Sequence, residues 1–371
     1  MKDGLGPAAV RRLAGALRRS DPSFDEAAFV RDACRGLAQL ELKARVQHVI
    51  DSLERHLPEN FPRALEIVVG AGEHRDSGDA DDPLRGFAWW PLIDWVAQAG
   101  LHDFDRSMAA LRRLTGLFSA EFAVRPFLER YPKRSLTLLK RWTRDDDANV
   151  RRLVSEGTRP RLPWGKHLQA FREDPGPTLE LLELLKDDES EYVRRSVGNH
   201  LNDIGKDHPD LLLDVCRRWN RQASPERRWI IERATRSLVK AGHPGVFALL
   251  GHTTDPKVRL SELTVVPKRV RLGGAIEISF ALGSKAARAQ NLVVDYAIFH
   301  QKADGSTRPK VFKLKKLTLA AGGSAEIEKR HAFRAISARR YHAGEHAVEI
   351  LVNGKALGRA GFVLTLPSAK A

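Results

Sequence analysis

The sequence predicts a multidomain α + β protein, in which an N-terminal α-solenoid of HEAT-like repeats precedes a C-terminal immunoglobulin-like β-sandwich. Three observations support this prediction. Apolar residues recur at helical spacing before about residue 260 and alternate with polar residues after it. A short Val-Arg motif recurs in the helical part. Positive charge is concentrated beyond the same boundary. We therefore expect a helical domain over residues 1–259 and a basic β-domain over residues 260–371.

The helical part is expected to consist of stacked helix pairs. The recurring motif appears as Val124-Arg125-Pro126, Val150-Arg151-Arg152 and Val193-Arg194-Arg195, and more weakly as Glu226-Arg227-Arg228. Apolar residues at helical spacing follow each copy, and acidic or proline-containing breaks separate the units. Helix pairs that bury their apolar faces only against neighbouring pairs are typical of a HEAT-type solenoid. An acidic stretch at 72–82 is expected to be a variable surface loop.

The C-terminal part is expected to form six or seven short strands. Residues 275–280, 311–319 and 347–352 contain stretches of period two, and 292–299 is a more continuous apolar run. The dipeptide Asn353-Gly354 separates two such runs and predicts a tight β-hairpin. This strand count is typical of an immunoglobulin-like sandwich, although the Cys–Trp–Cys core of antibody domains is missing from the sequence.

Charge indicates a polyanionic partner. The chain has a formal net charge of +15, and residues 260–371 contain 19 Lys+Arg against 8 Asp+Glu. Nucleic acid is the partner that this balance favours. The alternative is a merely soluble basic surface, or an arginine-rich composition inherited from a GC-rich genome. Lys313 and Lys315 are expected on one face of a strand, and Lys316 on the other. They either contact DNA or protect an edge strand against aggregation.

Several other classes of protein find no support in the sequence. No run of 18 apolar residues could span a membrane, and the first twenty residues do not resemble a signal peptide. Cys34 and Cys216 are too few for a disulfide scaffold, and neither an HExxH motif nor a GxxxxGK[ST] loop occurs. The two cysteines are consistent with a reducing cytoplasm.

Four segments of the helical part carry a resemblance to a known family. They are 40–46 (LELKARV), 118–127 (FSAEFAVRPF), 149–165 (NVRRLVSEGTRPRLPWG) and 193–203 (VRRSVGNHLND). Together they resemble the AlkC branch of the AlkC/AlkD DNA glycosylases, and the resemblance spans most of residues 1–250. Some members of that branch also have a C-terminal immunoglobulin-like domain. The resemblance implies excision of cationic alkylated bases, such as 3-methyladenine and 3-methylcytosine, from double-stranded DNA. It also implies that no metal and no organic cofactor take part, and we expect a monomeric bacterial protein of the cytoplasm and nucleoid.

Three carboxylates inside the matching segments are candidate catalytic residues: Asp203, Glu121 and Glu156. An N-alkylated base leaves easily because its positive charge is neutralised as the glycosidic bond breaks. The enzyme then needs a negative group to stabilise an oxocarbenium-like sugar and to place a water. Asp203 is the first choice for this role, and the other two would complete an acidic pocket. The alternative is that each is a surface carboxylate paired with an arginine, such as Glu156 with Arg152.

Further residues are expected to bind substrate or DNA. Trp164, in the Pro163-Trp164-Gly165 loop, can stack on a cationic base or on the sugar, or can plug the solenoid core. Arg152 is expected to approach the lesion or hold a phosphate. The cations expected to contact DNA phosphates are Arg159, Arg161, Lys166, Arg195, Lys313 and Lys315. His200 is expected to be packed rather than to act as a base.

Two rival functions remain open from the sequence. One is a non-enzymatic HEAT-repeat scaffold that binds nucleic acid or protein, and the other is an RNA-binding protein that uses the basic β-domain. A scaffold has no need of carboxylates on a basic groove, because they repel phosphate. The enzyme hypothesis therefore predicts that Glu121, Glu156, Asp203 and Trp164 converge in the folded protein.

Overall fold

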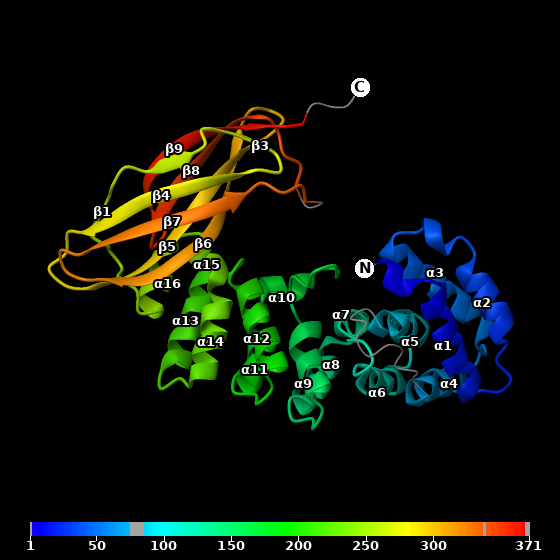
Figure 1. Ribbon diagram of the computed structural model, residues 1–371. Helices are drawn as coiled ribbons and strands as arrows, with labels where there is room; N and C mark the ends of the chain where they lie inside the picture. The colour runs from blue at the N-terminus through cyan, green and yellow to red at the C-terminus, as the bar shows by residue number, and fades with distance from the viewer. Residues whose placement is uncertain (1, 75–84, 337–338, 368–371) are drawn as a thin grey trace. The chain divides into compact units, whose positions relative to one another are not determined.

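The computed structural model describes residues 2–74, 85–336 and 339–367 (Figure 1). The expected loop at 72–82 therefore lies mostly outside the described residues. The chain separates into two compact units, one of residues 1–207 with 223–234 and the other of residues 208–222 with 235–371. Near the predicted boundary at residue 260, the first strand, β1, spans Val258–Leu260. Within the described ranges, no helix combines the length and the apolar character that crossing a membrane requires.

The first unit is built from helices that pack within pairs, for example α11 on α12, and between successive pairs, for example α9 on α12 (Figure 1). Its α-helices are α1 Pro7–Ser20, α2 Glu26–Cys34, α3 Leu42–His56, α4 Phe61–Glu73, α5 Trp90–Gly100, α6 Phe104–Leu114, α7 Arg125–Arg130, α8 Pro132–Trp142, α9 Ala148–Gly157, α10 Gln169–Glu173, α11 Gly176–Leu185, α12 Glu191–Ile204 and α14 Pro225–Ala234. The predicted HEAT-like helical domain is thereby confirmed.

The repeated Val-Arg motif has a structural cause. Its valines, Val150 in α9 and Val193 in α12, are buried between neighbouring helices. The following arginines turn back to close the preceding loop. Arg151 Nη1 donates to the carbonyls of Asp145 (2.8 Å) and Asp146 (3.0 Å). Arg194 Nη1 donates in the same way to the carbonyls of Asp188 and Glu189 (both 2.7 Å). These two copies of the motif therefore fix the start of α9 and of α12, whereas Arg125 of the first copy donates to carbonyls of residues 157–166 instead.

The second unit combines three helices with two β-sheets, and the sheets enclose one core. The helices are α13 Pro209–Asn220, α15 Arg236–Lys240 and α16 Pro244–Leu249. The strands are β1 Val258–Leu260, β2 Thr264–Val266, β3 Arg269–Arg271, β4 Ala275–Ser284, β5 Gln290–Gln301, β6 Thr307–Leu319, β7 Ser324–Ala332, β8 Gly344–Val352 and β9 Lys355–Thr365. In one sheet β4 pairs with β1, β2 and β7, and the other has the order β3-β9-β8-β5-β6.

Alternation places every second residue of the long strands in this core. On β4, Ile276, Ile278 and Leu282 are fully buried, and Ile298 on β5 lies opposite Val348 on β8. Each such side chain stabilises the sandwich by roughly 1.5–3 kcal/mol. The predicted hairpin is confirmed, because Asn353 and Gly354 have φ values of 45° and 77° between β8 and β9.

The sequence underestimated the number of strands and misplaced one lysine. The strands β1, β2 and β3 are each three residues long, which is too short for alternation to be visible. On β6, Lys313, Lys315 and Lys316 are all exposed, although Lys316 was expected on the opposite face from Lys313 and Lys315. A register shift opposite Val294 and Asp295 on β5 inserts an extra residue into β6 and breaks the alternation there.

Three histidines are buried in the β-domain, at His300, His331 and His346, where they pack against one another and against aromatic rings. Burial lowers the pKa of His331 to about 4. Burial, with Arg339 adding to it, lowers the pKa of His300 to about 3, and burial also lowers that of His346. All three imidazoles are therefore neutral in the folded protein at neutral pH.

These histidines predict an acid-sensitive β-domain. A depressed pKa means that the unfolded chain, with histidine pKa values near 6.5, binds protons first as the pH falls. Stability is therefore complete above about pH 6.5 and is lost towards pH 4, by at most about 1.4 kcal/mol per pH unit and per imidazole. Thermal melts of the full chain between pH 7.5 and 4 measure this slope. His346→Phe should make it shallower, whereas His167→Gln, at an exposed position, should not. Equal slopes for wild type and His346→Phe would contradict the assignment.

Candidate functional site

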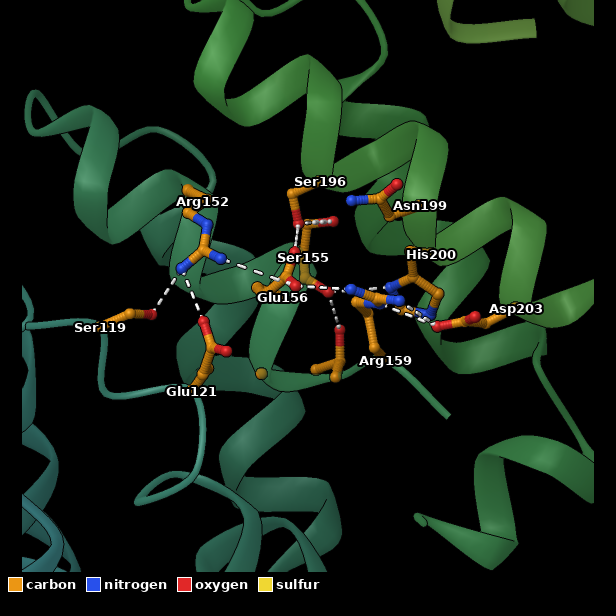
Figure 2. Close-up of polar contacts among 12 residues, drawn as sticks. Ser119, Glu121, Arg152, Ser155, Glu156, Arg159, Ser196, Asn199, His200 and Asp203 are labelled. Atoms are coloured by element: carbon orange, nitrogen blue, oxygen red, sulfur yellow. Dashed lines mark hydrogen bonds and ion pairs between the residues drawn. The ribbon is translucent and has the colours of Figure 1, made fainter. Parts of the chain in front are cut away.

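The candidate site lies in the helical unit, where α9, α12 and the turn before α7 bring the predicted carboxylates together. Glu156 lies in the last turn of α9 and Asp203 in the last turn of α12. Glu121 lies in the turn formed by residues 115–124. The apolar faces of α9 and α12 pack in the core, which holds the carboxylates on one side of these helices. Figure 2 shows the three carboxylates joined into one polar network.

Arg152 joins the first two carboxylates. Its guanidinium donates to Glu121 Oε2 (2.7 Å) and to Ser119 Oγ (2.6 Å), and it lies 3.6 Å from Glu156 Oε1. The side chains of Arg152 and Glu121 are only 14% and 16% exposed. The exposed ring of Tyr192 lies 4.8 Å from the Arg152 guanidinium and covers it from solvent. The pairing of Glu156 with Arg152 that their spacing suggested is thus present but long.

Arg159 joins the second and third carboxylates and makes the shorter contacts. It follows the C-terminus of α9, donates to Glu156 Oε1 (2.6 Å) and lies 2.7 Å from Asp203 Oδ2. Asp203 Oδ1 accepts from Lys206 (2.8 Å), and Ser196 Oγ donates to Glu156 Oε2 (2.6 Å). The charges therefore alternate in a row, which we call the carboxylate row: Glu121, Arg152, Glu156, Arg159, Asp203 and Lys206.

Burial and charge act in opposite directions on Glu156. Burial opposes its ionisation, but the neighbouring charges of Arg152 and Arg159 and the hydroxyl of Ser196 outweigh burial, so its pKa lies below the ordinary glutamate value. Glu156 is therefore ionised at neutral pH. The row fixes three carboxylates and three cations in a water-poor setting, where each charge acts strongly on its neighbours.

Ser196, which the sequence analysis missed, supports this row. It lies on the same face of α12 as His200 and Asp203, at helical spacing, which is the signal that could have identified it. His200 is packed, as predicted: it is fully buried, burial lowers its pKa to about 4, and its Nδ1 lies 2.9 Å from the Ser155 carbonyl. Because a carbonyl only accepts, Nδ1 carries the proton and His200 is neutral.

The remaining candidates divide into engaged and accessible cations. Arg159 was expected to contact phosphate, but it is 6% exposed and held by two carboxylates, which suits a positioning role. Arg161 forms a two-point ion pair with Asp207, whose pKa is lowered chiefly by that hydrogen bond. Lys166 and Arg195 have well-exposed side chains, paired with Glu129 and Glu191 respectively.

Trp164 lies outside the carboxylate row. It is 53% exposed and has a φ of 63°, a left-handed conformation that is rare for a bulky residue. Its carbonyl accepts a hydrogen bond from Lys43. The indole lines a cavity of about 330 Å³, to which the turn that carries Glu121 contributes Phe122. Among the described residues, no group of three or more histidines, cysteines or carboxylates has the arrangement of a metal site.

Comparison with known proteins follows the same division of the chain. A family described as DNA alkylation repair enzyme matches residues 118–238, which contain all three carboxylates. A second family, described as the C-terminal Ig-like domain of uncharacterised protein YhaZ, matches residues 259–366. Fold and site together therefore define a helical-repeat protein of the DNA alkylation repair class with an appended immunoglobulin-like domain.

Two full-length relatives place the chain within that class. Uncharacterized protein YhaZ of Bacillus subtilis is 36% identical over 348 residues, covering 93% of this chain and 94% of that protein. The structure of Pseudomonas fluorescens alkylpurine DNA glycosylase AlkC, bound to DNA containing an abasic site analog, is 39% identical, with a TM-score of 0.92 over 98% of this chain and 99% of that one. The chain belongs to the AlkC-type family of DNA alkylation repair glycosylases, as the sequence resemblance predicted.

Proposed function

We propose that the chain is a monofunctional DNA glycosylase that hydrolyses the glycosidic bond of cationic N-alkylated bases, such as 3-methyladenine and 3-methylcytosine, in double-stranded DNA. The observation that carries the proposal is the carboxylate row. Three carboxylates in a basic protein weaken the attraction for phosphate, so they need another purpose. Stabilising a cationic base and an oxocarbenium-like sugar supplies one. We propose that it works as a monomer in the bacterial cytoplasm, at the nucleoid.

The row suggests how the charges are used. Glu121 is the most exposed of the three carboxylates, and with Glu156 it would face the cationic nucleotide. Asp203 is 1% exposed and holds Lys206 through Oδ1, whereas the Lys206 side chain is 42% exposed. A DNA phosphate would draw this ammonium away and leave Oδ1 free to accept a hydrogen bond from water. Asp203 would then orient or deprotonate the attacking water as the base departs.

The surrounding cations would hold the duplex. Lys166 and Arg195 are the accessible cations near the row in sequence, and their ion pairs are exposed enough to exchange for phosphate. On the β-domain, Lys313 and Lys315 would make the same kind of contact. Arg161 could join them by releasing Asp207, while Arg152 and Arg159 would position the carboxylates. Trp164 would present its indole face to a base.

The proposed reaction is tested by incubating the purified protein with methylated duplex DNA in EDTA and identifying the free bases released. We expect release of 3-methyladenine or 3-methylcytosine without added metal, together with duplex binding that weakens steeply as salt is raised. Tight, salt-dependent binding with no release would favour the non-enzymatic scaffold. Release that stops in EDTA would contradict the metal-free mechanism.

A further inference from the structure

The cavity beneath Trp164 contains no residue of the carboxylate row, and of its lining only Trp164 and Lys166 enter the proposed function above. It lies within the helical unit, between α3, α5, the turn before α7 and the loop that follows α9. Its volume, about 330 Å³, is at the small end of the range for ligand pockets, roughly 300–1,000 Å³. It therefore suits a single ring system rather than a dinucleotide. The apolar lining consists of Val46, Ile50, Trp90, Phe122, Pro126 and Leu168.

One polar group in this lining is chemically unusual. Asp94 on α5 accepts a hydrogen bond from Trp90 Nε1 through Oδ2 (2.7 Å). Burial raises the pKa of Asp94 to about 7, against the lowering effect of this hydrogen bond and of Lys43. The carboxyl group is therefore protonated in a large fraction of molecules at neutral pH. A protonated carboxyl offers a donor and an acceptor side by side.

The cations around the cavity are already engaged. Lys43 donates to the Trp164 carbonyl, and Lys166 pairs with Glu129 (2.9 Å). Arg125 donates to the carbonyls of Gly157 (2.8 Å) and Arg159 (3.0 Å). Lys43 and Arg125 donate to backbone carbonyls within the protein, so of these three cations only the exposed Lys166 could exchange its partner for a phosphate. The buried part of the cavity therefore favours a neutral ligand over a nucleotide.

The exposed indole of Trp164, held in a left-handed turn, provides a flat surface for such a ligand. Trp90 is 3% exposed and is stacked on Phe118 and Phe122, with ring centroids 5.3 Å apart in each pair, so it holds Asp94 in place and offers no free face. A stacking surface together with a donor–acceptor pair matches a nucleobase, whose ring nitrogen and neighbouring amino group form the complementary edge.

We propose that this cavity binds one free nucleobase of the class released by excision, with the base edge on the Asp94 carboxyl and its ring against Trp164. The proposal rests on the proposed function, which supplies the ligand. Consecutive residues connect the two places, because Glu121 belongs to the carboxylate row and Phe122 lines the cavity. A base that leaves the row would therefore have a receiving site beside it.

The inference is tested by titrating 3-methyladenine into the full-length protein without DNA and following heat or tryptophan fluorescence. We expect saturable one-to-one binding with a Kd on the order of 0.1–1 mM, as befits a ligand of this size. Asp94→Asn keeps both the Trp90 contact and the donor–acceptor pair, so its Kd should stay within about threefold of wild type. Asp94→Leu removes the pair and should weaken binding about tenfold or more.

A second pair of variants tests the aromatic surface. Trp164→Ala should weaken binding about tenfold, because stacking on an indole is lost. Trp229→Ala removes another exposed tryptophan of the same unit and should leave the Kd unchanged. The inference would be overturned if wild type did not bind the base, or if Asp94→Leu and Trp164→Ala bound it as tightly as wild type does.

Excision measured on the same preparation separates this inference from the proposed function. Excision without base binding removes the cavity's role and leaves the glycosylase assignment standing. Base binding without excision supports the cavity and overturns the glycosylase assignment.

Discussion

Replacing Asp203 with asparagine is expected to reduce the rate of base excision by about 100–1,000-fold, the usual effect of losing one pre-organised electrostatic group. The same loss is expected for Glu121→Gln and Glu156→Gln, because each removes one negative charge from the carboxylate row while keeping the side-chain volume. DNA affinity should stay the same or rise, since a phosphate backbone then meets one carboxylate fewer. Single-turnover excision from methylated duplex measures the first quantity, and anisotropy of a labelled duplex measures the second.

A matched control exists on the same helix as Asp203. Glu191 begins α12, and its exposed carboxylate pairs with Arg195. Glu191→Gln makes an equal change in net charge outside the row and should keep the wild-type excision rate. If Asp203→Asn excised at the wild-type rate, Asp203 would have no catalytic role. If Glu191→Gln were as defective as Asp203→Asn, net charge rather than position would explain the loss.

The fold was predictable where local chemistry determines the backbone. Asn353 and Gly354 tolerate positive φ at two consecutive positions, which a hairpin of this kind requires, so the β8–β9 turn could be located from two residues. The Val-Arg copies could be located because the same loop closure recurs at Arg151 and Arg194. By contrast, the strands β1 to β3 leave no periodic signal, since three residues make little more than one alternation.

The sequence indicated which residues make up the candidate site, but not which of them form ion pairs with one another. The i,i+4 spacing of Arg152 and Glu156 suggested an ion pair, yet that distance is 3.6 Å while Arg159 approaches Glu156 to 2.6 Å. Arg159 lies beyond the end of α9, and its other partner, Asp203, is 44 positions away along the chain. Such a contact depends on how two repeats pack, which spacing within one helix does not encode.

The sequence also contains a signal for the buried position of Asp94, which the sequence analysis did not use. It lies four residues after Trp90 in a helix that is otherwise largely apolar, between Ile93 and Trp95. A carboxylate in such a helix needs a hydrogen-bond partner, and the spacing of four residues predicts that this partner is the indole of Trp90. The left-handed φ of Trp164 was harder to predict from the sequence. The proline before it and the glycine after it predict a turn, but they do not indicate which residue of the turn adopts the positive φ.

Arg159→Met is expected to be the most destabilising substitution in the site. The side chains of Arg159, Glu156 and Asp203 are 7%, 7% and 1% exposed. Removing the shared guanidinium leaves two buried carboxylates without their common partner, which costs about 3–5 kcal/mol. For a unit of this size that corresponds to a fall in Tm of roughly 6–20 °C. Arg161→Met breaks a pair that is about a quarter exposed and leaves Arg172 on Asp207, so it should cost about 1 kcal/mol or less.

The pH dependence of Arg159→Met distinguishes lost charge pairing from lost packing. Without the guanidinium, one of the charges that hold down the pKa of Glu156 is lost, so burial should raise the folded-state pKa of Glu156 relative to wild type. The variant is then penalised as the pH rises through that raised pKa, so its deficit relative to wild type should shrink as the pH falls from 8 to 5. Adding Asp203→Asn should also recover part of the loss, because one uncompensated charge disappears. A deficit that is constant with pH, and unchanged in the double variant, would mean that Arg159 contributes volume alone and that the carboxylates of the row are held by other partners.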